Sequence, residues 1–108
     1  MNKAIKKKWV KALRSGEYAQ CKGELAIAGK KYDTFCCLGV LCDVAGDHED
    51  FMFWRERPPE GGAIIFSEYT EFRRLCGIDD EAESTLVKMN DDDGASFKKI
   101  ATYIEKNL

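Results

Sequence analysis

The sequence has little of several features on which common activities depend. It contains one histidine, and no apolar run approaches the ~18 residues that suggest a membrane span. A single histidine leaves few ways to build a catalytic pair with a nucleophile. The phosphate-loop and hydrolase motifs G-x-x-x-x-G-K-[ST], G-x-S-x-G and H-E-x-x-H are also missing. These absences favour a binding protein over an enzyme, and they predict neither a membrane protein nor a cofactor enzyme.

Neither sign of charge is in excess. Seventeen Lys and Arg against nineteen Asp and Glu give a net charge of −2 at pH 7. The chain therefore lacks the overall positive field that binding to double-stranded nucleic acid relies on. Residues 1–16, MNKAIKKKWVKALRSG, lack the apolar core and the small-residue cleavage site of an export signal. We expect the protein in the cytoplasm.

The most apolar stretch is 32–46, YDTFCCLGVLCDVAG, which predicts a buried central helix. Read as a helix over 35–45, it has no polar stripe. Asp33 or Thr34 would cap its start, and Gly46 would end it.

The same stretch holds three of the five cysteines. An odd number of cysteines, two of them adjacent, excludes a complete disulfide framework. Their position in an apolar helix favours small core residues over two alternatives. One is a zinc site with His48, which the ligand spacing disfavours. The other is a reactive thiolate at the helix N-terminus, at Cys36 or Cys37.

The remaining segments predict amphipathic helices and short strands. The first expected helix is Lys3–Ser15, ended by Gly16, and a second covers 67–76, ended by Gly77. A third runs from Asp79 or Asp80 through Met89, with Asp80 and Glu83 as a capping box. The final helix is capped by Ser96. Expected strands lie within 17–31 and at 51–57 and 63–66. Because helices and strands are segregated, we predict a single α+β domain over 1–108, with a small antiparallel sheet.

Three groups of polar and aromatic residues are candidate binding elements. The lysines of the first helix, Lys6, Lys7, Lys8 and Lys11, form either a solvated face or a contact for phosphate or an acidic partner. Trp54 and Arg55 combine an aromatic ring with a guanidinium group, as sites for a base and its phosphate do. The acidic turn 91–94 does not fit a calcium loop, because Met89 and Ile100 would stand where carboxylates are required. We expect no metal site.

Three segments together resemble a family of small proteins from tailed phages and prophages: ALRSGEYAQCKGEL at 12–25, FCCLGVLCDVAG at 35–46 and LVKMNDDDGASFKKIATYIEKNL at 86–108. The chain departs from the family pattern by an extra acidic residue in MNDDDG. The resemblance implies an accessory phage protein acting inside a bacterium. The family's polar motif residues fall on Arg14, Tyr18, Gln20, Asn90 and Asp91.

By analogy with other small phage proteins, the resemblance suggests a counter-defence protein that sequesters a nucleotide-derived signal of the cyclic oligonucleotide or cyclic ADP-ribose type. An aromatic ring, Tyr18 or Trp54, is expected to stack on the base. Arg14, Lys22 and Arg55 are the cations expected to contact phosphate. Gln20, Asn90 and Asp91 are the polar groups expected to contact base or ribose edges. We expect a homo-oligomer, since a small chain has little room for a deep pocket. The alternatives are an inhibitor that binds a host defence protein and a small hydrolase that uses Cys37 or Asp91.

Overall fold

The structure is a computed structural model that describes residues 1–23, 26–27, 33–45, 74 and 76–108. Several sequence predictions lie outside the described residues. They are the strands at 51–57 and 63–66, the end of the central helix at Gly46, the zinc alternative through His48, and most of the helix at 67–76.

Helix α1 (Lys3–Ser15) has the predicted bounds. It begins after Asn2, whose side-chain oxygen accepts a hydrogen bond from the backbone N–H of Ile5 at 3.0 Å. It ends at Gly16, which takes the left-handed conformation with φ 79°. Trp9 and Leu13 are buried on its inner face.

Helix α2 (Cys37–Ala45) is buried from Cys37 to Cys42, as predicted, but it starts two residues later than expected. Thr34 and Phe35 pair with two other strands, which keeps the backbone extended there. The prediction that Asp33 or Thr34 caps the helix is therefore wrong. Cys36 lies at that position: its carbonyl accepts from Val40 N–H at 3.0 Å, and its sulfur accepts from Gly39 N–H at 3.4 Å.

Helix α5 (Asp80–Asp91) begins where the sequence predicted, but it ends two residues later than the predicted end at Met89. Its cap is Asp79, which accepts from Ala82 N–H at 2.7 Å, so Asp80 is the first helical residue and not the cap of the predicted Asp80/Glu83 capping box. The helix also continues through Asn90 and Asp91, which the sequence pattern had assigned to a turn.

Helix α6 (Phe97–Asn107) begins after Ser96, as predicted. The Ser96 hydroxyl accepts from Lys99 N–H at 3.2 Å. The apolar side chains of α6 recur at helical spacing and are buried: Phe97, Ile100, Ala101 and Ile104.

A three-stranded sheet precedes α2, with strands β1 (Ala19–Gln20), β2 (Ala26–Ile27) and β3 (Thr34–Phe35) in the order β1-β3-β2. β2 is antiparallel to β3, but β1 is parallel to it. The sheet is thus mixed, with one parallel and one antiparallel pair, and the antiparallel pair predicted from 51–57 and 63–66 lies outside the described residues. The central strand, β3, lies just beyond the segment in which the sequence had placed the strands.

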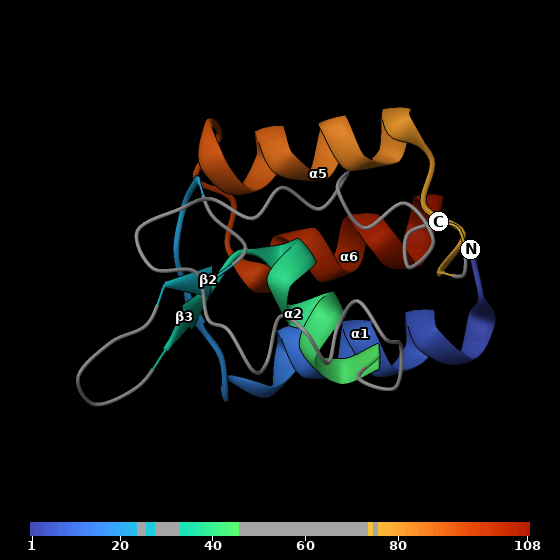
Figure 1. Cartoon of the computed structure of the whole chain (residues 1–108), viewed down its shortest axis with the longest axis horizontal. Coiled ribbons are helices and arrows are strands. Elements are labelled where there is room, and N and C mark those ends of the chain that lie inside the picture. The colour runs from blue at the N-terminus through green and yellow to red at the C-terminus, as the bar shows by residue number, and fades with distance from the viewer. Residues whose placement is uncertain (24–25, 28–32, 46–73, 75) are drawn as a thin grey trace.

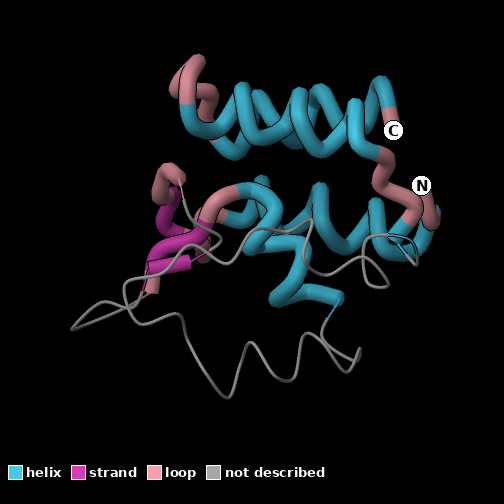
Figure 2. Tube along the Cα trace, turned by 45° about the horizontal axis from the view of Figure 1, so that its top comes forward, coloured by secondary structure: helices cyan, strands magenta, loops and turns pink. Residues whose placement is uncertain are grey.

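The described residues form an α+β fold of four helices and this small sheet, which confirms the predicted fold class. α1 packs against α6 and α2, and α5 packs against α2 and α6, so residues from all four helices share one core. Figure 1 shows α1 and α6 side by side, with both chain termini at the same end of the helices. The sheet lies at the opposite end, where α2 begins (Figure 2).

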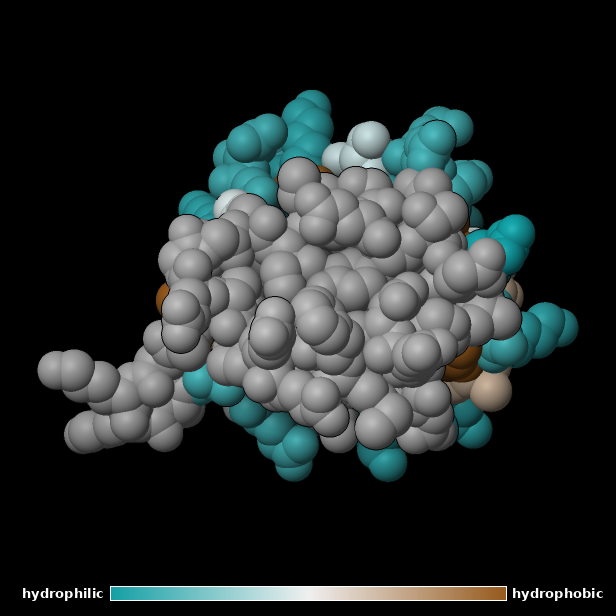
Figure 3. All heavy atoms as spheres, in the orientation of Figure 1, coloured by the Kyte–Doolittle hydropathy of each residue, from teal (hydrophilic) through white to brown (hydrophobic). Residues whose placement is uncertain are grey.

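The outer surfaces of α1 and α5 are mainly hydrophilic where Figure 3 shows them at the edge of the molecule. Two large apolar side chains are exposed among the described residues, Ile27 and Val87. None of the helices described here has the length and apolar character needed to cross a bilayer.

Two glycines with nearly the same backbone conformation should respond differently to alanine. Gly16 has φ 79° and nothing within 4 Å of an added Cβ, whereas Gly77 has φ 78° and its Cβ would lie 2.7 Å from the backbone Cα of Met1. We expect G16A to lower the free energy of unfolding by about 1 kcal/mol through backbone strain alone. G77A should cost about 2 kcal/mol more, because Asn2 N–H is bonded to the carbonyl of Cys76 and holds the clashing backbone in place. Urea denaturation would measure both values, and equal costs would contradict the close approach.

Candidate functional site

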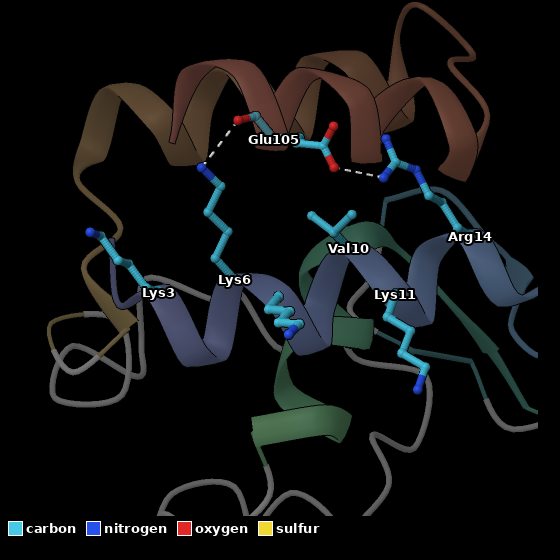
Figure 4. Close-up of a pocket in the computed structure, with 7 residues that line it drawn as sticks. Lys3, Lys6, Val10, Lys11, Arg14 and Glu105 are labelled. Carbon is cyan, nitrogen blue, oxygen red and sulfur yellow. Dashed lines mark hydrogen bonds and ion pairs between the residues drawn. The ribbon is translucent and has the colours of Figure 1, made fainter.

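A groove of about 470 Å³ lies between α1 and α6. We call it the α1–α6 groove and define it by its seven lining residues: Lys3, Lys6, Lys7, Val10, Lys11, Arg14 and Glu105. Figure 4 shows Lys6 and Arg14 reaching from α1 toward α6 with Val10 between them, while Lys11 points away from α6. Five of the seven lining residues are Lys or Arg, so the groove is strongly positive.

The spacing along α1 produces this concentration of charge. Each of the six lining residues of α1, at positions 3, 6, 7, 10, 11 and 14, has another of them three or four positions away, which places them on one face of the helix. From Lys3 to Arg14 the helix rises by about 16 Å at 1.5 Å per residue. The buried face of α1, with Trp9 and Leu13, fixes the orientation of the cationic face. The groove is thus an extended row of cations rather than a single-charge site.

Glu105 of α6 is the one acidic residue in the groove lining. Its carboxylate accepts a hydrogen bond from Arg14 Nη1 at 2.7 Å, and Arg14 Nη2 lies 3.5 Å from the hydroxyl of Thr102. Lys6 Nζ donates to the backbone carbonyl of Glu105 at 3.1 Å. The hydrogen bond and the charge of Arg14 lower the pKa of Glu105 below its ordinary value, so the carboxylate is ionised at neutral pH.

Chemically, this groove is suited to holding anions. Ammonium and guanidinium groups donate hydrogen bonds and contribute positive charge, and guanidinium matches the geometry of phosphate and carboxylate. No cysteine, histidine, serine or threonine is among the seven residues that define the groove. The groove thus offers cationic hydrogen-bond donors to an anion.

The structure places the predicted ligand residues in different environments. Arg14 lines the α1–α6 groove. Tyr18 is half-buried: its ring packs edge-on against Phe35 with centroids 5.2 Å apart, and its hydroxyl donates to the carboxylate of Asp43. Lys22 is exposed, and its Nζ lies beside Gly94 in the segment between α5 and α6. Trp54 and Arg55 lie outside the described residues.

Two of the other three predicted residues, Gln20 and Asp91, are hydrogen-bonded to the third, Asn90, and we call the three the Asn90 network. Asn90 is 1% exposed. Its side-chain oxygen accepts from Gln20 Nε2 at 2.8 Å and from Cys37 N–H at 3.2 Å. Its side-chain nitrogen donates to the Cys21 carbonyl and to Asp91 Oδ1, both at 2.8 Å. All four hydrogen-bonding positions of the Asn90 amide are thereby used within the protein.

The Asn90 network also binds backbone groups of neighbouring segments. Gln20 Nε2 donates to the Ala95 carbonyl at 2.8 Å, and Asp91 accepts from Gly23 N–H at 3.0 Å. The network thus joins the β1 region, the start of α2 and the end of α5. This geometry gives Asn90 a structural role, and a ligand contact by Asn90 stays a prediction.

All five cysteines are free and buried. Burial raises the pKa of Cys36 to about 12 and of Cys76 to about 11, and it raises those of Cys37 and Cys42 well above the ordinary thiol value. The helix N-terminus therefore does not produce a thiolate at Cys37, because desolvation outweighs it. Among the residues that the structure describes, no three His, Cys, Asp or Glu side chains gather into a possible metal site.

Thiol labelling should reflect this burial. With a pKa of about 12, Cys36 would be ionised in roughly one molecule in ten thousand at about pH 8, so the native protein should react very slowly with iodoacetamide. Below the pKa the thiolate fraction grows as pH rises. Because burial raises the pKa of Cys36 and Cys76, this growth continues into the alkaline range, where labelling should accelerate. In guanidinium chloride all five thiols should react readily. Mass spectrometry would count the labels, and rapid native labelling of Cys37 would contradict its burial.

Sequence reasoning named Lys6, Lys7 and Lys11 of the groove, together with Lys8, which is not among its lining residues, and it missed Lys3 and Glu105. The lysines show a recurrent spacing within one helix, whereas Glu105 meets Arg14 across 91 positions of the chain. No local pattern marks such a pair.

The fold and the groove define a small α+β protein with a cationic groove between α1 and α6. The chain belongs to the family described as a domain of unknown function, DUF8296, whose model matches residues 1–73. No curated protein and no solved structure matches the chain.

Proposed function

We propose that this protein is a non-enzymatic binding protein that holds a phosphate-bearing, nucleotide-derived ligand in the α1–α6 groove. The observation that carries the proposal is the groove's charge: five cations against one carboxylate, in a chain whose net charge is −2. A positive groove on a slightly negative protein arises from local arrangement and not from overall composition. Such a groove attracts anions to one place on the surface.

The proposed ligand class follows from the row of cations. Lys3, Lys7 and Lys11 are exposed point charges that neutralise phosphate without demanding one geometry, and Arg14 can present two parallel donors to a phosphate or carboxylate. A ligand with several phosphate groups can meet several of these cations at once. The nucleotide part of the proposal, and a counter-defence role in a host bacterium, rest on the resemblance to phage proteins.

The same groove supports a second candidate, an inhibitor that binds an acidic surface of a host defence protein. Lys3, Lys7 and Lys11 are exposed, as rim charges of a protein interface are. A hydrolase receives less support, because the thiols are buried with raised pKa values and Asp91 is engaged in the Asn90 network.

Calorimetry with inorganic tripolyphosphate, a cyclic dinucleotide and cyclic ADP-ribose would test the proposal. We expect binding at low salt, with an affinity that falls steeply as salt is added, since phosphate contacts release counterions. Nucleotide that is bound and then released by heating should be recovered unchanged. A hydrolysed nucleotide would favour the enzyme alternative. Failure of all three probes to bind, together with co-purification of one acidic host protein, would favour the inhibitor.

A further inference from the structure

Glu105 occupies the part of the α1–α6 groove that a phosphate would use. Its carboxylate is 2.7 Å from Arg14 Nη1, and its backbone carbonyl is 3.1 Å from Lys6 Nζ. A carboxylate and a phosphate present the same kind of oxygen to a guanidinium group. Figure 4 shows both contacts converging on Glu105 from α1.

From this geometry we infer that Glu105 is a built-in competitor for the ligand: its carboxylate holds the Arg14 guanidinium until a phosphate group displaces it. This inference rests on the proposed function of the groove. In this role Glu105 lowers the affinity of the groove for anions, so that only a multiply charged anion binds strongly enough to be retained.

Displacement is feasible because both partners are accessible to water. The side chains of Arg14 and Glu105 are 40% and 58% exposed. Exposed ion pairs of this kind contribute little to stability and exchange readily with other ions. Opening the pair would leave each group solvated, so a ligand need not expose a buried charge.

The other cations of the groove remain available while Arg14 is engaged. Lys3, Lys7 and Lys11 form no ion pair with any residue in the described part of the chain. Lys6 is bound to a carbonyl at the C-terminal end of α6, where the helix dipole favours a positive charge. A polyphosphate can therefore bind the free lysines first and then compete with Glu105 for Arg14.

The experiment compares the binding of inorganic tripolyphosphate to the wild-type protein, E105Q and E81Q. E81Q makes the same change in net charge at an exposed position in the first turn of α5, which does not line the groove. We expect E105Q to bind roughly three- to tenfold more tightly than wild type, because the competing charge is removed, and E81Q to differ by less than about twofold. Unfolding of all variants in urea would verify that each is folded.

A second comparison, in an R14Q background, distinguishes competition for Arg14 from a general effect of charge. Most of the gain from E105Q should disappear when Arg14 is absent, as in a double-mutant cycle. A gain of the same size in that background would overturn the inference. Binding by wild type with no gain in E105Q would also overturn it but would leave the proposed function intact. If neither wild type nor E105Q bound tripolyphosphate, both would fall.

Discussion

Replacing Asn90 with alanine is expected to lower the free energy of unfolding by about 3 to 5 kcal/mol. Asn90 is 1% exposed and makes four hydrogen bonds. Alanine would leave the Cys37 N–H and the Cys21 carbonyl without this partner in the interior. Each buried polar group that loses its partner costs about 1 to 3 kcal/mol, which makes this the largest stability effect that we predict.

Asn107 provides the matched control, because it is the same residue type in an exposed helical position. Its side-chain nitrogen donates to the Tyr103 carbonyl at 2.9 Å at the end of α6. N107A should change the free energy of unfolding by less than about 0.5 kcal/mol. Urea denaturation followed by circular dichroism would measure both variants. Similar values for N90A and N107A would show that the Asn90 network does not hold the segments together.

Reversing two charges of the α1–α6 groove is expected to weaken tripolyphosphate binding by about a hundredfold. The double variant K7E/K11E replaces two attractive contacts with two repulsive ones. Both lysines are exposed, and neither forms a hydrogen bond or ion pair with the described residues. The fold should therefore be retained, and the loss should appear in the calorimetric affinity and as a shallower dependence on salt.

The control for this variant changes the net charge equally but elsewhere. K88E/K99E alters one exposed lysine on α5 and one on α6, neither of which lines the groove. Each double variant changes the net charge by −4, from −2 to −6. The control should lose less than about fivefold in affinity, through long-range repulsion alone. Equal losses in the two variants would show that the ligand responds to overall charge and not to the groove.

The sequence was sufficient to predict elements whose signals are local. Helix α6 combines a capping serine with a regular apolar spacing, and its start and buried face follow the prediction. Helix α1 likewise carries its end signal in Gly16. The burial of α2 follows from a segment with almost no polar side chains.

Features that depend on distant partners could not be predicted in this way. Asn90 and Asp91 begin a polar run, NDDDG, that resembles a turn, yet they remain helical and bond to segments about 70 positions earlier. The late start of α2 results from strand pairing at Thr34 and Phe35, a contact between segments and not a preference of those residues. Asn90 was named as a ligand residue from the resemblance to phage proteins and from its polar character, and neither showed that it bonds inside the protein to Gln20, Cys21 and Cys37.

The contacts along α1 bear on how the groove binds. Asn2 N–H donates to the Cys76 carbonyl at 3.0 Å, and the buried indole of Trp9 donates to the Cys37 carbonyl at 2.9 Å. The helix is thus anchored at its first turn and again at its middle, to two different parts of the molecule. A ligand would meet a backbone that is already ordered, and the entropy lost on binding would come mainly from lysine side chains. Affinity in such a preorganised site depends on how many charges the ligand brings, and less on any rearrangement of the protein.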